Sequence, residues 1–124
     1  MHTSTAIAAD TSMENEVELN YRLTGHLQQN ETVLSTLLSI HDGIYAATDR
    51  RILCVNCDRI GYRLRVHPYC DLERVEFIEY DDASYVQFSS AGRQLTVRAR
   101  SRKDARGFVD AVAAHITFLQ APLA

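Results

Sequence analysis

The sequence has no tryptophan, only two prolines and no long apolar run, and each shortage argues against a class of protein. So few prolines in 124 residues are not typical of a disordered or linker-rich chain. The longest uncharged apolar stretches, such as residues 33–40, are far shorter than the roughly 20 residues that span a bilayer. The first residues also lack the basic segment and apolar run of a signal peptide. We therefore expect a protein that is neither transmembrane nor exported.

Cysteine is scarce as well, and the three residues present are an odd number. This fits a reducing compartment better than a disulfide scaffold, so we expect a cytoplasmic protein. The hydrophobic fraction of 46% and the charged fraction of 23% are ordinary for a globular chain. At this length, one domain buries a core without disulfide or metal cross-links.

The charges are segregated along the chain, although the net charge is only −3. Residues 1–31 and 71–82 are mainly acidic, whereas residues 50–65 and 93–106 are mainly basic. These blocks indicate either a polar molecule or ion pairs between neighbouring strands. A chain without a global basic field is not expected to bind nucleic acid.

Hydrophobic periodicity predicts a mainly β domain with a helix at each end. We expect a disordered tail over residues 1–12, a helical segment within 13–30 with its helix at 15–29, and a folded domain over 31–120. Turn signals such as Gly43 separate seven apolar or alternating segments, which indicate antiparallel strands. The predicted strands are residues 33–40, 44–48, 51–56, 62–67, 72–80, 84–89 and 94–100.

After residue 100 the period of the apolar residues changes from two to about 3.6. Ser101 is a good N-cap, and Asp104 completes a pattern like a capping box. Apolar residues such as Ala105, Phe108 and Val112 then form one stripe of a helix. Because the edges of an open sheet need covering, we expect a seven-stranded antiparallel barrel or sandwich capped by this helix.

Residues 62–67 alternate strictly, with apolar residues at even positions and basic residues at odd positions. The basic residues are Arg63, Arg65 and His67. This alternation predicts a half-buried strand with a basic outer face, ended by Pro68.

Several segments together resemble the bacterial PH (pleckstrin-homology-like) domains of the YokE-like type. They are Glu31-Thr32-Val33-Leu34, Gly43-Ile44-Tyr45-Ala46-Ala47-Thr48-Asp49-Arg50-Arg51-Ile52-Leu53, Tyr69-Cys70-Asp71-Leu72-Glu73-Arg74-Val75-Glu76 and the helical pair Phe108-Val109. The resemblance covers roughly residues 27–119. It implies a PH-like fold, and it implies function only broadly, because similar domains bind phosphoinositides, dock proteins or oligomerise.

The leading functional hypothesis is a non-catalytic module that binds a protein or peptide partner, including a second copy of itself. A sheet edge accepts an extended segment by strand addition, and a groove between helix and sheet offers an apolar recess. No nucleophile, base and orienting group form a recognisable set, so no catalytic residue and no cofactor is predicted.

An alternative function is the binding of anionic lipid headgroups or phosphate ligands through an arginine patch. Its candidate residues are Arg50, Arg51, Arg63 and Arg65. Guanidinium groups at the Thr48–Arg51 turn would grip a phosphate in bidentate fashion. In the structural alternative, the same arginines pair with the acidic residues 71–82, and Asp49 caps backbone amides.

A wider basic patch is a further interpretation of the basic residues. Arg63, Arg65 and His67 would form a wider basic patch with Arg98 and Arg100 if their strands adjoin.

A zinc or redox site on Cys54, Cys57, His67 and Cys70 has suitable spacing for three thiolates and an imidazole. Against zinc, residues three apart in a strand point to opposite faces, and a buried Cys54 is simply a small hydrophobe. We therefore predict no metal ligand.

Overall fold

The computed structural model describes residues 13–41 and 43–119. The predicted tail over residues 1–12 lies outside the described residues. The elements in chain order are α2 (Met13–Gly25), β1 (Val33–Leu38), β2 (Ile44–Thr48), β3 (Arg51–Cys57), β4 (Tyr62–Pro68), the 3₁₀ turn η1 (Tyr69–Asp71), β5 (Leu72–Tyr80), β6 (Ala83–Ser90), β7 (Arg93–Arg98) and α3 (Arg102–Leu119). All seven predicted strands and both helices are present, with ends shifted by a few residues.

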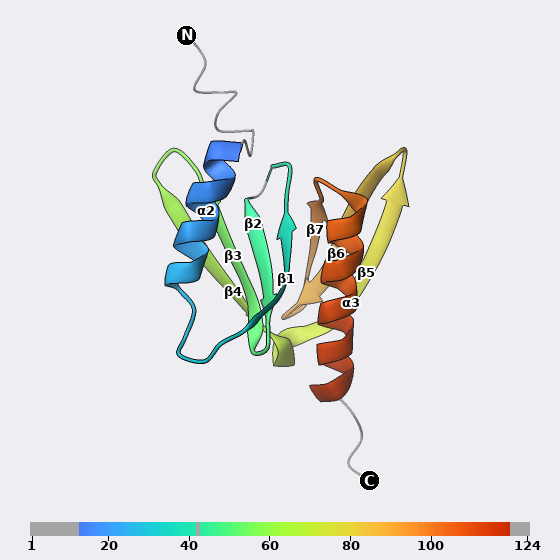
Figure 1. Ribbon diagram of the computed structural model, residues 1–124. Coiled ribbons are helices and arrows are strands. Elements are labelled where there is room, and N and C mark those ends of the chain that lie inside the picture. Colours follow the sequence, from blue (N-terminus) through green and yellow to red (C-terminus); the bar gives the residue numbers. More distant parts are fainter. Residues whose placement is uncertain (1–12, 42, 120–124) are drawn as a thin grey trace.

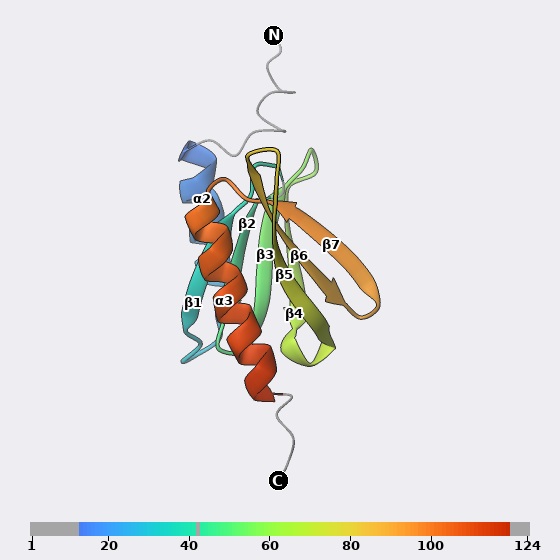
Figure 2. The same cartoon turned by 90° about the vertical axis from the view of Figure 1, so that its right-hand side faces the viewer.

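The strands form two antiparallel sheets that face each other (Figures 1 and 2). One sheet has the order β1-β2-β3-β4 and the other has the order β5-β6-β7. The sheets meet at β1 and β7, where Ser39 bridges Ala99 and the Ile40 N–H donates to the Arg98 carbonyl at 3.0 Å. Neither β4 nor β5 has a second strand neighbour in the described sheets, so the sandwich is open along that side.

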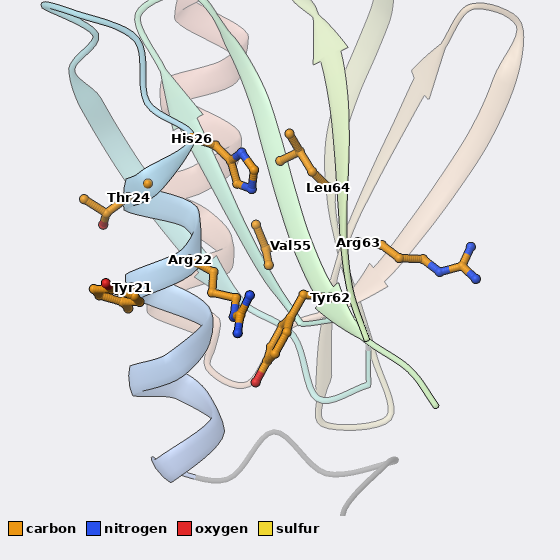
Figure 3. Close-up of a pocket in the computed structure, with 9 residues that line it drawn as sticks. Tyr21, Arg22, Thr24, His26, Val55, Tyr62, Arg63 and Leu64 are labelled. Carbon is orange, nitrogen blue, oxygen red and sulfur yellow. The ribbon is translucent and has the colours of Figure 1, made fainter. Parts of the chain in front are cut away.

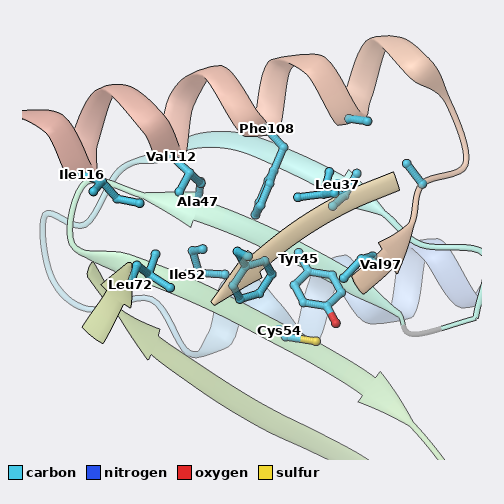
Figure 4. Packing of buried hydrophobic residues seen from close by; sticks show 14 of the residues in the cluster. Leu37, Tyr45, Ala47, Ile52, Cys54, Leu72, Val97, Phe108, Val112 and Ile116 are labelled. Atoms are coloured by element: carbon cyan, nitrogen blue, oxygen red, sulfur yellow. The ribbon is translucent and has the colours of Figure 1, made fainter. Parts of the chain in front are cut away.

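The main core fills the space between the sheets and is closed by α3 (Figure 4). Phe108 and Val112 of α3 are fully buried there, and the Phe108 ring meets the Tyr45 ring edge-on at 6.4 Å between centroids. The helix begins as predicted, because the Asp104 N–H donates to the Ser101 hydroxyl at 3.1 Å. The predicted seven-stranded antiparallel sandwich capped by a C-terminal helix is therefore confirmed.

A second core lies on the opposite face of the four-stranded sheet, beneath α2 (Figure 1). Leu19 and Leu23 of α2 pack there against Leu53 and Val55 of β3. Because α2 covers the outer face, β2 and the centre of β3 are buried on both sides. This explains why their sequences are continuous apolar runs and not alternating ones.

No helix within residues 13–41 and 43–119 is both long enough and apolar enough to cross a membrane.

Candidate functional site

Strand β4 is a free edge of the four-stranded sheet, whereas β1 at the other edge joins the second sheet. The Asp58 N–H donates to the Gly61 carbonyl at 2.9 Å, and the β3–β4 register continues from there without a shift. In an antiparallel ladder, hydrogen-bonded residue pairs alternate with pairs that are not hydrogen-bonded. Counting from the bonded pair Asp58 and Gly61, the residues of β4 whose backbone N–H and C=O groups bond to β3 are Arg63, Arg65 and His67. The even-numbered residues then direct theirs outward, and Pro68 fits this pattern because it has no N–H to bond.

A groove borders this edge on the outer side of the sheet, between α2 and β4 (Figure 3). Its volume is about 480 Å³. Leu64 and Val66 lie opposite Val55 and Leu53 in the β3–β4 register, so their side chains continue the apolar surface that α2 covers. They are 38% and 39% exposed, which leaves an uncovered apolar row along the edge.

Helix α2 supplies the other wall of the groove. The Arg22 guanidinium lies over the Tyr62 ring at 3.9 Å from its centroid, and its Nε donates to Glu18 at 2.8 Å. His26 and Leu64 also line the groove. Arg63 points away from it in Figure 3 and pairs with Asp58 at 2.6 Å. The groove therefore has an apolar floor and polar ends, which suits an amphipathic ligand.

On the inner side of β4, a second cavity of about 450 Å³ lies between the two sheets. Arg65 and His67 reach it from β4, Asp71 from η1, and Arg93 from β7. The prediction that the basic face of β4 is the outer face is therefore wrong. Arg65 and His67 lie opposite the buried Cys54 and Ile52, and they stay accessible only because the sandwich is open beside β4.

His67 is one of the residues that line this inter-sheet cavity. Its ring meets the Phe88 ring edge-on at 5.3 Å, and its Nε2 is buried without a hydrogen-bond partner among the described residues. Burial lowers the pKa of His67 below its ordinary value of 6.5, and the charge of Arg65 lowers it further. Because its pKa lies below 6.5, the imidazole is mainly neutral at pH 7.

The free energy of unfolding should depend on pH through His67. The unfolded chain takes up a proton near pH 6.5, whereas the folded chain resists it. Relative to a His67→Gln variant, the wild type should be most stable above pH 6.5 and lose that advantage as the pH falls. Urea denaturation of both proteins between pH 7.5 and pH 5 measures this, and parallel pH profiles would contradict it.

The Thr48–Arg51 turn is held by the chain itself. Arg51 donates from Nε and Nη2 to the two carboxylate oxygens of Glu31, both at 3.0 Å, and Nη2 also reaches the His26 carbonyl. Arg50 donates to the Gln28 side chain and the Gln29 carbonyl. Both arginines thus anchor the segment between α2 and β1.

The prediction that these arginines pair with the acidic residues 71–82 is wrong. Their hydrogen bonds go to Glu31 and to residues 26–29. Asp49 accepts the backbone N–H of Thr32 at 3.0 Å, so it caps an amide of the neighbouring segment.

The wider basic patch does not form. Arg98 and Arg100 lie at and just beyond the end of β7, which joins β1, whereas β4 is at the far edge of the other sheet. Arg100 instead lies 3.6 Å from Glu16.

The four residues of the zinc alternative are not gathered either. Cys54 is buried in the main core, and Cys57 and Cys70 are exposed. No cluster of three potential ligands among His, Cys, Asp and Glu occurs in the described part of the chain. The described residues therefore do not form the zinc site that the spacing suggested.

Two components of the candidate site were missed by sequence reasoning. Arg93 was counted only as part of a basic block, because nothing local places it beside Arg65. The wall from α2 was missed because the spacing of its apolar residues fits no clean period. Its buried pair Leu19 and Leu23, four residues apart, is the signal that could have shown which helix face packs on the sheet.

Comparisons with known proteins agree with this architecture. The family described as "Bacterial PH domain" matches residues 27–114, so α2 precedes the matched region. The chain is similar in structure to a DUF1696 family protein with a pleckstrin-homology domain from Shewanella loihica PV-4, with a TM-score of 0.51 and 16% identity over 77% of this chain and 97% of that one. None of the curated proteins compared with the chain matches it. PH-type domains generally serve as non-catalytic binding modules, and by the family match this chain belongs to the bacterial PH domain family.

Proposed function

We propose that this protein binds an extended segment of a partner protein by strand addition at the β4 edge. The observation that carries the proposal is the free edge itself, flanked by the uncovered apolar row of Leu64 and Val66. Main-chain hydrogen bonds supply affinity in this mode of recognition, and pockets for alternate side chains supply specificity. The groove beside α2 provides such a pocket.

The charge of β4 favours a different protein over a second copy of this chain. Two β4 strands that pair antiparallel must join through the outward groups of their even-numbered residues. Arg65 then faces Arg65 or Arg63 of the other copy, and like charges directly opposite each other are destabilising. Arginine on a free edge therefore disfavours self-pairing while leaving the edge open to other sequences.

The arginine-patch alternative has weaker support. Of its four residues, Arg50, Arg51 and Arg63 all have acceptors within the chain, whereas Arg65 has neither an ion pair nor a side-chain hydrogen bond among the described residues. A lipid headgroup would have to displace those contacts. We therefore place Arg65 in the peptide site and treat binding to anionic vesicles as a competing outcome.

Proline at position 66 tests strand addition directly. It removes an outward N–H and leaves the β3–β4 ladder intact, so the domain should fold. Peptides selected on the full-length wild type from a random phage-displayed library should bind Val66→Pro at least roughly tenfold more weakly, measured by fluorescence anisotropy. Val66→Ala shortens the same side chain but keeps the N–H, and should bind nearly as well as the wild type.

Melting curves of both variants provide the folding control. Equal peptide affinity for Val66→Pro and Val66→Ala, or no peptide enriched over background, would rule out the β4 edge as the binding site.

A further inference from the structure

The inter-sheet cavity lies on the inner side of the β4 edge, whereas the groove lies on its outer side. It is lined by two arginines, one histidine and one carboxylate, from Arg65, Arg93, His67 and Asp71. Neither arginine has an ion pair among the described residues, and the His67 Nε2 is buried without a partner. The cavity thus holds an excess of positive charge.

We infer that this cavity receives the carboxylate of an acidic side chain from the partner's strand, an inference that rests on the proposed strand addition. Side chains that are directly opposite each other on paired strands lie on the same face of the sheet, about 5 Å apart at Cβ. The partner residue opposite Arg65 therefore points into the cavity, toward Arg93. Its neighbours on either side point to the outer face, toward Leu64 and Val66.

The partner segment is thereby defined as apolar, acidic, apolar at three successive positions. The carboxylate accepts hydrogen bonds from the Arg65 guanidinium and from the Arg93 guanidinium. Charge-assisted hydrogen bonds of this kind are about twice as strong as neutral ones. A glutamine in place of the partner's acidic residue has no negative charge, so it leaves an arginine in this partly desolvated cavity without a charged partner.

The basic cavity contrasts with the chain as a whole, whose net charge is −3. A partner with an acidic strand is attracted to this basic cavity, which favours the orientation that places its carboxylate there. The single carboxylate in the cavity, Asp71, belongs to the β4–β5 connection, and its backbone carbonyl accepts the Ala91 N–H at 3.0 Å. That bond fixes the end of the cavity between η1 and the β6–β7 hairpin.

A change of specificity tests the inference. The full-length wild type and the Arg65→Glu variant are each used to select from the same random peptide library, with Arg98→Glu as the matched control. Arg98 is an exposed arginine of β7 outside the cavity, so its replacement changes the net charge equally. We expect the wild type and Arg98→Glu to enrich the apolar, acidic, apolar pattern, and Arg65→Glu to enrich a basic residue at the central position.

A selected peptide should also lose affinity roughly tenfold when its acidic residue becomes glutamine. An acidic preference that persists in Arg65→Glu, or that Arg98→Glu loses as well, would overturn the inference while the Val66→Pro result still supports strand addition. Binding to vesicles containing anionic lipid that is abolished by Arg65→Glu, with no acidic preference among peptides, would assign the cavity to a lipid headgroup. Failure of the proposed function itself would appear as equal binding to Val66→Pro and Val66→Ala.

Discussion

Replacing Arg51 by alanine should lower the free energy of unfolding by about 3–5 kcal/mol, because it leaves a buried carboxylate without its counter-charge. The Glu31 side chain has no solvent exposure, and that of Arg51 is 17% exposed. The Thr48 hydroxyl also donates to Glu31 at 2.6 Å, and the Gln28 N–H does so at 2.9 Å. These bonds position the carboxylate but do not supply the charge that stabilises it.

Chemical denaturation of both proteins measures this loss. The Arg74–Glu76 pair offers the control, because it is as short, at 2.7 Å, but its side chains are 68% and 46% exposed. Arg74→Ala should therefore change the unfolding free energy by less than about 1 kcal/mol. Similar losses for Arg51→Ala and Arg74→Ala would show that burial of the Glu31 pair contributes nothing.

The same pair makes stability depend on pH in acid. The hydrogen bonds that Glu31 accepts from Arg51 lower the pKa of the Glu31 carboxyl from 4.5 to about 2. Its contribution is therefore complete above pH 4.5 and is lost as the pH falls toward 2, by about 3 kcal/mol in total. A protonated Glu31 has no charge for Arg51 to neutralise. The difference in unfolding free energy between the wild type and Arg51→Ala should therefore become smaller as the pH falls from 4.5 toward 2.

The pair also bears on binding, because Arg51 holds the His26 carbonyl at the end of α2. That helix forms one wall of the groove beside β4. Arg51→Ala should thus weaken peptide binding at the groove between α2 and β4, even at temperatures where the domain remains folded.

Local features of the sequence were enough to predict most of the secondary structure. The Ser101 cap, the stripe through Phe108 and the alternation in residues 62–67 depend only on neighbours in the chain, and each formed the expected element. The two faces of β4 were also separated correctly. Which face is the inner one depends on the position of β4 at the open side of the sandwich, and no local pattern carries that information.

Long-range partners account for the remaining differences. Arg51 pairs with Glu31, which is 20 residues earlier, although residues 71–82 offer many more carboxylates. Arg93 joins Arg65 in one cavity because the β6–β7 hairpin folds back toward η1. The composition of a charged block predicts that ion pairs form, but only the packing of two sheets determines which ones.

Gly43 shows how a correct local prediction can underestimate a residue's importance. The turn was expected to need a positive φ, and Gly43 has a φ of +88°. The structure adds a second constraint, since a Cβ at this position would lie 2.8 Å from the Asn56 Cα and would also collide with the Val55 carbonyl oxygen. These are backbone atoms of β3, so the strand itself would have to move.

Gly43→Ala should therefore destabilise the domain by about 3 kcal/mol, of which about 1 kcal/mol comes from the positive φ and the rest from overpacking. Gly92 provides the matched control, because its φ is +81° and no atom lies within 4 Å of the position of its Cβ. Thermal unfolding of the two alanine variants separates the two terms. A melting temperature several degrees lower for Gly43→Ala than for Gly92→Ala would show that the close approach of the β1–β2 turn to β3 dominates, whereas equal shifts would mean that the positive φ accounts for the whole cost.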